Sequence, residues 1–270
     1  MIARHDIRPG GQVATTLAAC ARFGLATRYI GAFGNDDHGT RIRRALEDRG
    51  IDVQSAVVRT AANRYAVILI DATHGERVVL WERDAALAFR PDDVCTEWLA
   101  GAALLHVDAT DEAAATRLAR LGRDRGLPVT CDVDRVTGAT SELLDAVTVP
   151  ILAEHVPQDI THEADPERAL RLLRRPPTGR IVLTLGARGS AMLDGDRFIH
   201  VPGFDVSVVD TTGAGDVFRG AFIYSLLRGD RPAQMLRFAN AAAALSCTRE
   251  GAIEGIPTRE EVERFLARGV

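Results

Sequence analysis

One short run of residues combines tight-turning glycines with acidic side chains: Asp210-Thr211-Thr212-Gly213-Ala214-Gly215-Asp216. It lies between an apolar, strand-like run at 206–209 and an apolar helical stretch at 217–227. Small residues let the backbone turn at a helix N-terminus, where free N–H groups and the helix dipole attract anions. The run therefore predicts a phosphate site built from main-chain amides, with Asp216 on its rim to accept the proton of an attacking hydroxyl. The alternative is a plain helix start at which the glycines only make a turn.

The basic residues narrow the possible chemistry. All 33 of them are arginine, and the chain contains no lysine. Mechanisms that need a lysine amine are therefore excluded: the Walker A loop, the protein-kinase strand lysine and the Schiff base of pyridoxal phosphate enzymes. A phosphate site in this chain must be made by backbone amides or arginines.

Composition points to a small-molecule partner. A net charge of −4 and a pI near 6.0 give no general attraction to nucleic acid or anionic membranes. The sequence has no apolar run of 18 residues and no apolar segment at its start, so we expect a cytoplasmic protein. The cysteines are scattered and predict buried thiols rather than a zinc site or disulfides: Cys20, Cys95, Cys131 and Cys247.

Short apolar runs that alternate with helical stretches predict a doubly wound α/β domain with a mostly parallel sheet. The expected strands are 103–107, 128–131, 147–152 and 181–185, and the expected helices include 12–23, 40–49, 111–125 and 166–174. Two strand-like runs, 64–71 and 76–83, flank Ala72-Thr73-His74-Gly75 and predict a hairpin apart from the main sheet, a small β-lid. A second hairpin is expected at 190–201, and three helical stretches follow Ala214.

The segment DTTGAGDVFRGAF closely resembles the C-terminal signature of the ribokinase-like (PfkB) carbohydrate kinases. Further similar segments follow in the family's order: Gly10-Gly11, the run 31–39 (similar to GxxGxDxxG), Thr184-Leu185-Gly186 with Gly189, and 240–251. The resemblance implies one three-layer αβα domain over 1–270 and transfer of phosphate from ATP to a hydroxyl of a small sugar-like substrate.

The resemblance also implies roles for individual residues. Asp216 would be the catalytic base, and the amides of Gly213, Ala214 and Gly215 the anion hole. Glu154 would orient Mg²⁺ through water, and carbonyls of Asp210 and Thr212 would bind a monovalent cation, K⁺ in several members. The residues expected at the nucleotide are Thr184, Gly186, Gly189, Asn240 and Gly251, and those at the sugar are Gly10, Gly11, Asp108 and Arg64. Arg64 could instead be a solvated arginine at the start of the hairpin.

The hairpin residues Tyr65, Val67, Leu69, Val79 and Trp81 are too apolar for full exposure, so we expect a homodimer that forms through the lid.

Three positions depart from the family pattern. Only nine residues precede Gly10, where the family usually has a strand and a substrate-binding aspartate. Either the start is misassigned or truncated, or an edge strand and part of the sugar site are absent. Thr15 replaces an asparagine after the glycine pair, which argues against direct sugar contact there. Ile151 replaces the asparagine of the NxxE motif that ends at Glu154.

Two other function classes follow from these observations. The short N-terminus leaves open a catalytically weak, nucleotide-binding regulatory protein of the same fold, which turnover of ATP with a panel of sugars would distinguish. A dinucleotide-dependent oxidoreductase needs GxGxxG, but Phe218 stands where the third glycine belongs. The sequence also contains neither GxSxG nor HExxH, the motifs of serine hydrolases and zinc proteases.

Overall fold

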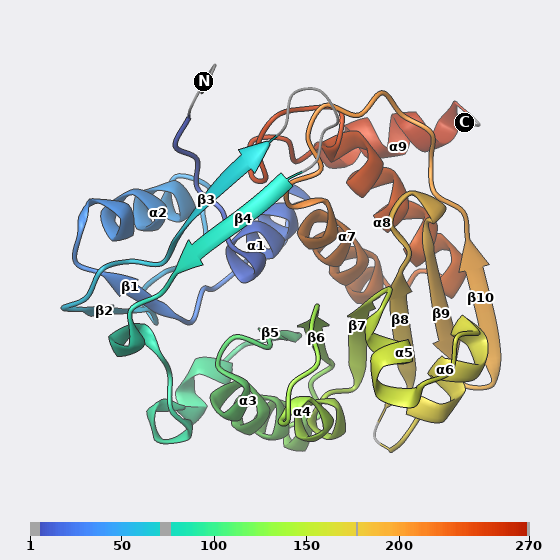
Figure 1. The fold of residues 1–270 in the computed structure, drawn as a ribbon, viewed down its shortest axis with the longest axis horizontal. Helices are drawn as coiled ribbons and strands as arrows, with labels where there is room; N and C mark the ends of the chain where they lie inside the picture. Colours follow the sequence, from blue (N-terminus) through green and yellow to red (C-terminus); the bar gives the residue numbers. More distant parts are fainter. Residues whose placement is uncertain (1–5, 71–76, 177, 269–270) are drawn as a thin grey trace.

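A six-stranded sheet lies between two layers of helices in the computed structural model, which describes residues 6–70, 77–176 and 178–268 (Figure 1). The helices of the layer that carries the glycine-rich run are α1 (Gln12–Arg22), α7 (Ala214–Arg228), α8 (Pro232–Ser246) and α9 (Arg259–Ala267). The opposite layer contains α3 (Glu112–Asp124), α4 (Thr140–Ala146), α5 (Val156–Thr161) and α6 (Pro166–Leu173). The expected three-layer αβα fold with a mostly parallel sheet is confirmed.

The sheet order is β10-β9-β8-β7-β6-β5. The strands are β5 (Leu105–Asp108), β6 (Val129–Val133), β7 (Val149–Ala153), β8 (Arg180–Thr184), β9 (Ser190–Asp194) and β10 (Arg197–Val201). From β5 to β8 the pairing is parallel, whereas β8, β9 and β10 pair antiparallel. Asp108 lies directly opposite Asp132 in this register, so two carboxylates emerge side by side at the same end of neighbouring strands.

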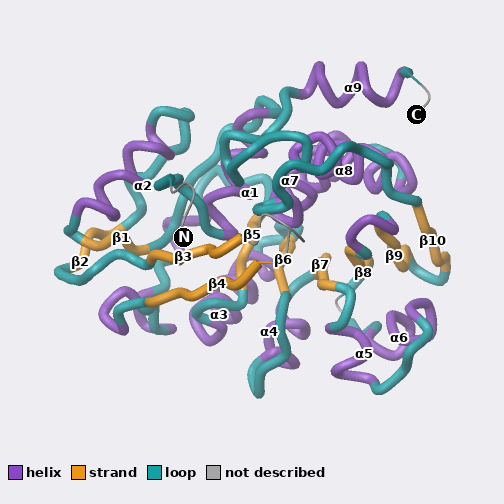
Figure 2. Tube along the Cα trace, turned by 45° about the horizontal axis from the view of Figure 1, so that its top comes forward, coloured by secondary structure: helices purple, strands orange, loops and turns teal. Residues whose placement is uncertain are grey.

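Two smaller sheets lie apart from the central one (Figure 2). Strands β1 (Ala32–Gly34) and β2 (Val57–Arg59) form a parallel pair that flanks α2 (Asp37–Glu47). Strands β3 (Tyr65–Ile70) and β4 (Arg77–Glu82) form an antiparallel hairpin at the expected place, with the loop Ala72–Gly75 outside the described residues. Short 3₁₀ turns follow at Ala85–Leu87, Pro91–Asp93 and Thr96–Leu99, and another occurs at Gly186–Arg188.

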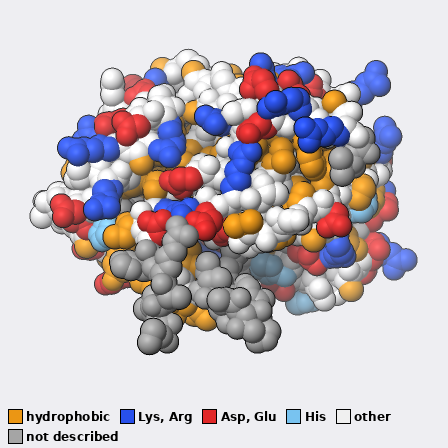
Figure 3. Space-filling model, turned by 90° about the horizontal axis from the view of Figure 1, so that it is seen from above, with side chains coloured by type: hydrophobic (Ala, Val, Ile, Leu, Met, Phe, Trp, Pro, Cys, Tyr) orange, Lys and Arg blue, Asp and Glu red, His pale blue; other side chains and the backbone are white. Residues whose placement is uncertain are grey.

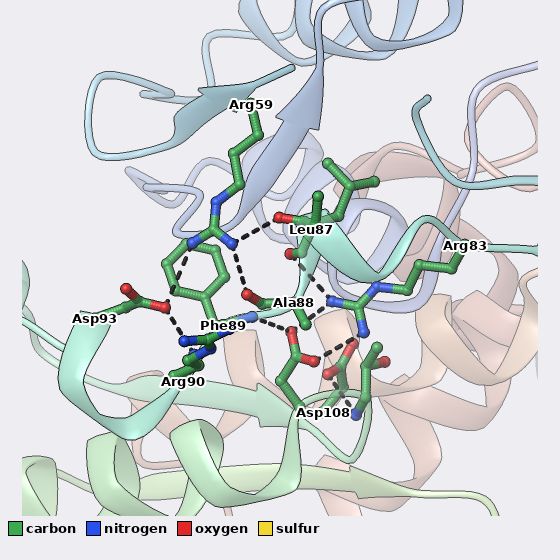
Figure 4. Close-up of polar contacts among 11 residues, drawn as sticks. Arg59, Arg83, Leu87, Ala88, Phe89, Arg90, Asp93 and Asp108 are labelled. Atoms are coloured by element: carbon green, nitrogen blue, oxygen red, sulfur yellow. Dashed lines mark hydrogen bonds and ion pairs between the residues drawn. The ribbon is translucent and has the colours of Figure 1, made fainter. Parts of the chain in front are cut away.

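Two arginines attach the base of the hairpin to the body (Figure 4). Arg59 donates to the carbonyls of Ala86 (2.7 Å) and Ala88 (2.6 Å) and lies over the Phe89 ring, 4.9 Å from its centroid. Arg83 points toward the end of β5, where Asp108 lies. The strands beyond these anchors are largely exposed.

Helices α1 and α7 approach each other closely at Gly220. A Cβ added to Gly220 would lie 2.5 Å from the Ala19 Cβ and 2.8 Å from the Thr16 carbonyl oxygen. The Thr16 hydroxyl donates to the Asp216 carbonyl at 3.3 Å. Because small residues let the two helices pack closely in the buried core, α1 fixes the position of the first turn of α7.

The expectation of a strand-like run at 206–209 is wrong. Residues 202–207 have no regular structure, and Val208 and Val209 are exposed. The amides of Val209 and Asp210 donate instead to the Cys247 carbonyl at the end of α8, at 2.8 and 3.2 Å. Because that partner is a helix end rather than a strand, the apolar run forms an extended lead-in to the glycine-rich loop. Among the described residues, no helix is long and apolar enough to cross a membrane.

Candidate active site

The glycine-rich run forms the start of α7. Gly213 is the N-cap with φ 77°, a left-handed conformation that glycine adopts without steric cost. A Cβ at this position would lie 2.7 Å from the Ala252 Cβ and 3.3 Å from the Thr15 methyl carbon, so the loop is held against both neighbours. Thr15 is fully buried here, consistent with the expectation that it does not contact a sugar. The loop thus leads directly into the N-terminus of a 15-residue helix, where anions are favoured. The Ala214 amide, expected in the anion hole, donates in this structure to the Thr211 carbonyl at 3.2 Å.

Asp216 is in the first turn of α7, with its side chain 15% exposed. Burial raises the pKa of this carboxyl to about 7; the Arg219 guanidinium opposes the rise, and the carboxylates of Asp132, Asp134 and Asp108 add to it. A base with a pKa near neutrality combines availability with proton affinity, which suits general-base chemistry.

A buried ion pair lies beneath Asp216. Arg219, one turn further along α7, pairs with Asp132 of β6, and both side chains are almost inaccessible to solvent. The second nitrogen of the Arg219 fork, Nη1, lies 3.6 Å from the Asp216 carboxylate. Burial raises the pKa of Asp132 to about 6, although the Arg219 charge lowers it. The pair was not identified from the sequence, because 87 residues separate its members.

The Asp210 carboxylate closes the loop in front of α7. One of its oxygens accepts from the Thr212 amide at 2.8 Å and the other from the Gly251 amide at 2.9 Å. Burial raises the pKa of Asp210, but these hydrogen bonds outweigh it and leave the pKa below its usual value. The side chain is thus engaged with backbone amides, which leaves carbonyl oxygens as the groups that could meet a cation.

Residues expected at the nucleotide surround the turn between β8 and β9. Thr184 ends β8, and Gly186 and Gly189 both have positive φ, 57° and 93°. Asn240 of α8 lies behind this turn and is only 5% exposed. Its amide accepts from the Ser190 hydroxyl at 2.8 Å and donates to the carbonyls of Val201 (3.0 Å) and Pro202 (3.2 Å). In this conformation the Asn240 side chain fixes the turn and the end of β10 rather than presenting its amide to a ligand.

Glu154 lies just beyond β7 and forms an exposed ion pair with Arg188. The described residues contain no group of three or more His, Cys, Asp or Glu side chains able to hold a metal ion by themselves. A magnesium ion at this end of the sheet would therefore depend on phosphate oxygens and water for most of its ligands.

The residues expected at the sugar lie at the other side of Asp216. Gly10 and Gly11 precede α1, and Gly11 has φ 113°. Asp108 ends β5, where burial raises the pKa of its carboxyl despite a hydrogen bond from the Thr110 amide and the charge of Arg64. Arg64 is exposed at the start of the hairpin, with its guanidinium 5.2 Å from the centre of the Trp81 ring.

One further pair near Asp108 was missed by sequence reasoning. Arg83 donates to both oxygens of Asp111, at 2.8 and 2.6 Å, and each side chain is about one fifth exposed. Asp111 also accepts from the Phe89 amide at 3.0 Å. The only signal in the sequence was an arginine at the end of the hairpin and an aspartate before a helix, a combination too common to single out.

Comparisons with known proteins agree with this geometry. The family model "pfkB family carbohydrate kinase" matches residues 3–259. The ribokinase of Bacillus subtilis (strain 168) is 29% identical over 96% of this chain and 88% of its own length. The ATP-dependent ribose-1-phosphate kinase of Halopiger xanaduensis is also 29% identical, over 96% of this chain and 86% of its own. The solved structure of Arabidopsis thaliana ribokinase complexed with ribose and ATP superimposes with a TM-score of 0.85, at 26% identity, over 95% of this chain and 87% of that one.

Proposed function

Since the chain belongs to the pfkB family of carbohydrate kinases and is an ATP-dependent phosphotransferase acting on a sugar or nucleoside, we propose that Asp216 is its catalytic base. The observation that carries the proposal is the position of a buried carboxylate, with a pKa of about 7, in the first turn of the helix that starts at the glycine-rich loop.

In the proposed reaction, Asp216 accepts the proton of the substrate hydroxyl while the oxygen of that hydroxyl forms a bond to the γ-phosphorus of ATP. The bond between that phosphorus and the β–γ bridging oxygen breaks, and ADP leaves. Amides of Gly213 and Gly215 stabilise the charge that develops on the phosphoryl oxygens. The Ala214 amide would join them after exchange away from the Thr211 carbonyl. The proton goes to Asp216, the phosphoryl group to the substrate oxygen, and the electron pair of the broken bond to ADP, so no other co-reactant is needed.

Magnesium enters this proposal as part of the MgATP substrate, as in the E. coli neighbour whose structure was solved in complex with ATP and Mg²⁺. Glu154 would bind a water of the ion, which requires its exchange away from Arg188. Thr184, Gly186, Gly189 and Gly251 would border the nucleotide through their backbone. Because ATP is supplied in the cytoplasm, we place the protein there.

Carbonyls of Asp210 and Thr212 are proposed to bind K⁺. The Asp210 carboxylate supports this role indirectly, since it fixes both the 210–212 loop and Gly251. Turnover measured in K⁺ and in tetramethylammonium at equal ionic strength tests the assignment, and equal rates would contradict it.

The sugar site is proposed to lie between Gly10–Gly11 and Asp108, under the hairpin. An aspartate at the end of a strand accepts hydrogen bonds from neighbouring hydroxyls well. Arg64 is the one residue proposed here that could meet an anionic group on a substrate. Figure 3 shows acidic and basic side chains interspersed on the face seen from above, without a broad area of one sign, as suits small ligands.

A homodimer through the hairpin is the last part of the proposal. The register divides its apolar side chains between two faces, with Tyr65, Val67 and Leu69 on one and Trp81 on the other. The sequence-based grouping of Trp81 with Tyr65 is therefore wrong, because partners opposite each other share a face and Trp81 is opposite Ala66. For Val79 the structure describes the backbone but not the side chain.

The face with Tyr65, Val67 and Leu69 also carries Val78 and Leu80, and all five are exposed. It is the surface proposed to meet a second copy. Sedimentation at micromolar concentration is expected to give a dimer that Leu80→Glu dissociates; a wild-type monomer would contradict the proposal.

The variant Asp216→Asn tests the base directly. It keeps the size and much of the hydrogen bonding of the side chain but removes the basic carboxylate, so turnover should fall by roughly 10²-fold or more. ATP affinity, measured by calorimetry, should change little, because the amides hold the phosphates. Unchanged turnover would exclude Asp216 as the base, and equal losses of binding and turnover would indicate a structural role at the helix start.

A further inference from the structure

The buried pair beneath the active site contains an arginine placed to act on the base. Arg219 follows Asp216 by three positions, so both side chains emerge on the same face of α7. Its side chain folds back toward the helix N-terminus, and Nη1 lies only 2.7 Å from where a Cβ on Gly215 would be. Any larger residue at 215 would displace this guanidinium, which gives Gly215 a second role besides the turn.

Asp132 fixes the orientation of that guanidinium. The carboxylate belongs to β6, which lies between β5 and β7 in the sheet, and is 1% exposed, whereas Arg219 is 6% exposed. With Nη2 held by the sheet, Nη1 is directed toward Asp216 at 3.6 Å. In the part of the chain that is described, the buried atoms Arg219 Nε and Asp132 Oδ2 have no hydrogen-bond partner, so the pair retains unused hydrogen-bonding capacity.

The charges around Asp216 explain why an arginine is useful there. Asp132 and Asp134 face it from β6 and the residue beyond, and Asp108 from β5. Arg64 acts from the hairpin on Asp108, and His106 of β5 is buried with a pKa lowered to about 3 by burial and by Arg219, so it adds no positive charge. Helix α1 carries no charged side chain before Arg22. Arg219 is thus the charge with the largest effect on Asp216, and the only positive one among the described groups named here that act on it.

We propose that Arg219, oriented by Asp132, is a positioning residue for Asp216 that holds its carboxylate toward the substrate and keeps it in the charged form that can accept a proton. The inference rests on the proposed role of Asp216 as the base. The alternative is a purely structural pair that fastens α7 to β6, as buried ion pairs often do.

Removal of each partner should move the pH dependence of the reaction in opposite directions. Arg219→Met removes a positive charge, so the acidic limb of kcat/KM should move to higher pH by about one unit or more, with an about fivefold loss at pH 7 that alkaline pH restores. Asp132→Asn removes a neighbouring negative charge, and Asp216 is then the remaining carboxylate that pairs with Arg219. The acidic limb of kcat/KM should therefore move to lower pH. Arg219→Lys should stay closer to the wild type than Arg219→Met.

A buried aspartate without its arginine can unfold the protein, so the double variant Asp132→Asn/Arg219→Met completes the set. It contains neither charge, and its limb should fall between those of the single variants. Thermal melting identifies the folded variants, and ATP affinity serves as a control that should change little. A purely structural role predicts one limb position in every folded variant, and that result would overturn the proposal.

Carbon-13 titration of the Asp216 carboxyl, assigned by its loss in Asp216→Asn, separates this inference from the proposed function. A midpoint that rises in Arg219→Met and falls in Asp132→Asn supports the action of Arg219 on Asp216, whatever the turnover. If Asp216→Asn keeps full turnover, the base assignment fails. If Asp216→Asn is inactive but the midpoint does not move in the Arg219 variants, only the role of Arg219 fails.

Discussion

The first turn of α7 and the β3–β4 hairpin lie on opposite sides of the expected substrate position, and they are built in opposite ways. The turn is buried against α1, Ala252 and β6, with its charges paired inside the protein. The hairpin exposes apolar side chains on both faces and is anchored at its base by Arg59 and Arg83. Phosphoryl transfer needs groups fixed within fractions of an ångström, whereas a cover over the substrate must open. Substitutions should therefore affect turnover at the turn and substrate affinity at the hairpin.

Apart from replacement of Asp216 itself, the largest effect is expected at Gly213. In Gly213→Ala, strain at φ 77° adds to a close contact with Ala252, so stability should fall by roughly 2–4 kcal/mol and turnover by about tenfold or more. Gly229 is a matched control at the other end of α7, with φ 73° and nothing within 4 Å of an added Cβ. Gly229→Ala should lose only about 1 kcal/mol and keep its turnover. Equal losses, measured by urea unfolding and kinetics, would refute the close-packing argument.

The next largest effect is expected from acidic pH, which should lower kcat/KM by protonating Asp216 in the first turn of α7. If Asp216 is the base, it must be deprotonated to act, and its pKa is about 7, so kcat/KM should fall as the pH drops through 7. The rate at pH 6 should be roughly tenfold below its plateau. Because several carboxylates interact here, the midpoint belongs to the cluster as a whole. A rate that stays flat from pH 8 to pH 5.5 would argue against a base of this pKa.

A smaller effect, on affinity, is expected at the hairpin base. Arg83→Gln breaks the two-pronged bond to Asp111 beside Asp108, so KM for the sugar should rise several-fold while kcat stays within about twofold. Arg43→Gln is the control, because Arg43 forms an exposed pair with Glu47 within α2, away from the hairpin base. A fall in kcat with unchanged KM would place Arg83 with the catalytic turn instead.

The smallest effect is expected at Arg64. Its guanidinium is exposed and lies over the Trp81 ring, an interaction of about 0.5–1 kcal/mol at such a site. For an uncharged sugar, Arg64→Met should change KM by less than about twofold. A large rise in KM that appears only with a phosphorylated or carboxylated substrate would instead assign Arg64 to an anionic group.

Features that depend on neighbouring residues could be predicted from the sequence alone. The contiguous run 210–216 contains its own turn, helix start and acidic group, and the alternation of apolar runs with helical stretches indicates the α/β fold. The strands expected at 103–107 and 181–185 lie within two residues of β5 and β8. Local spacing suffices for such features, because φ preference and hydrophobic periodicity act over a few residues.

Contacts between side chains that are distant in the sequence could be found only in the tertiary structure. The Asp132–Arg219 pair, the capture of the Asn240 amide by Ser190 and the end of β10, and the separation of Trp81 from Tyr65 depend on strand register and helix packing. A shift of one residue in register would move Asp132, Ser190 or Trp81 to the opposite face of its strand and away from the partner described here. Register is set by the whole buried core, so the partners that control the charge on Asp216 could not be derived from the residues around it.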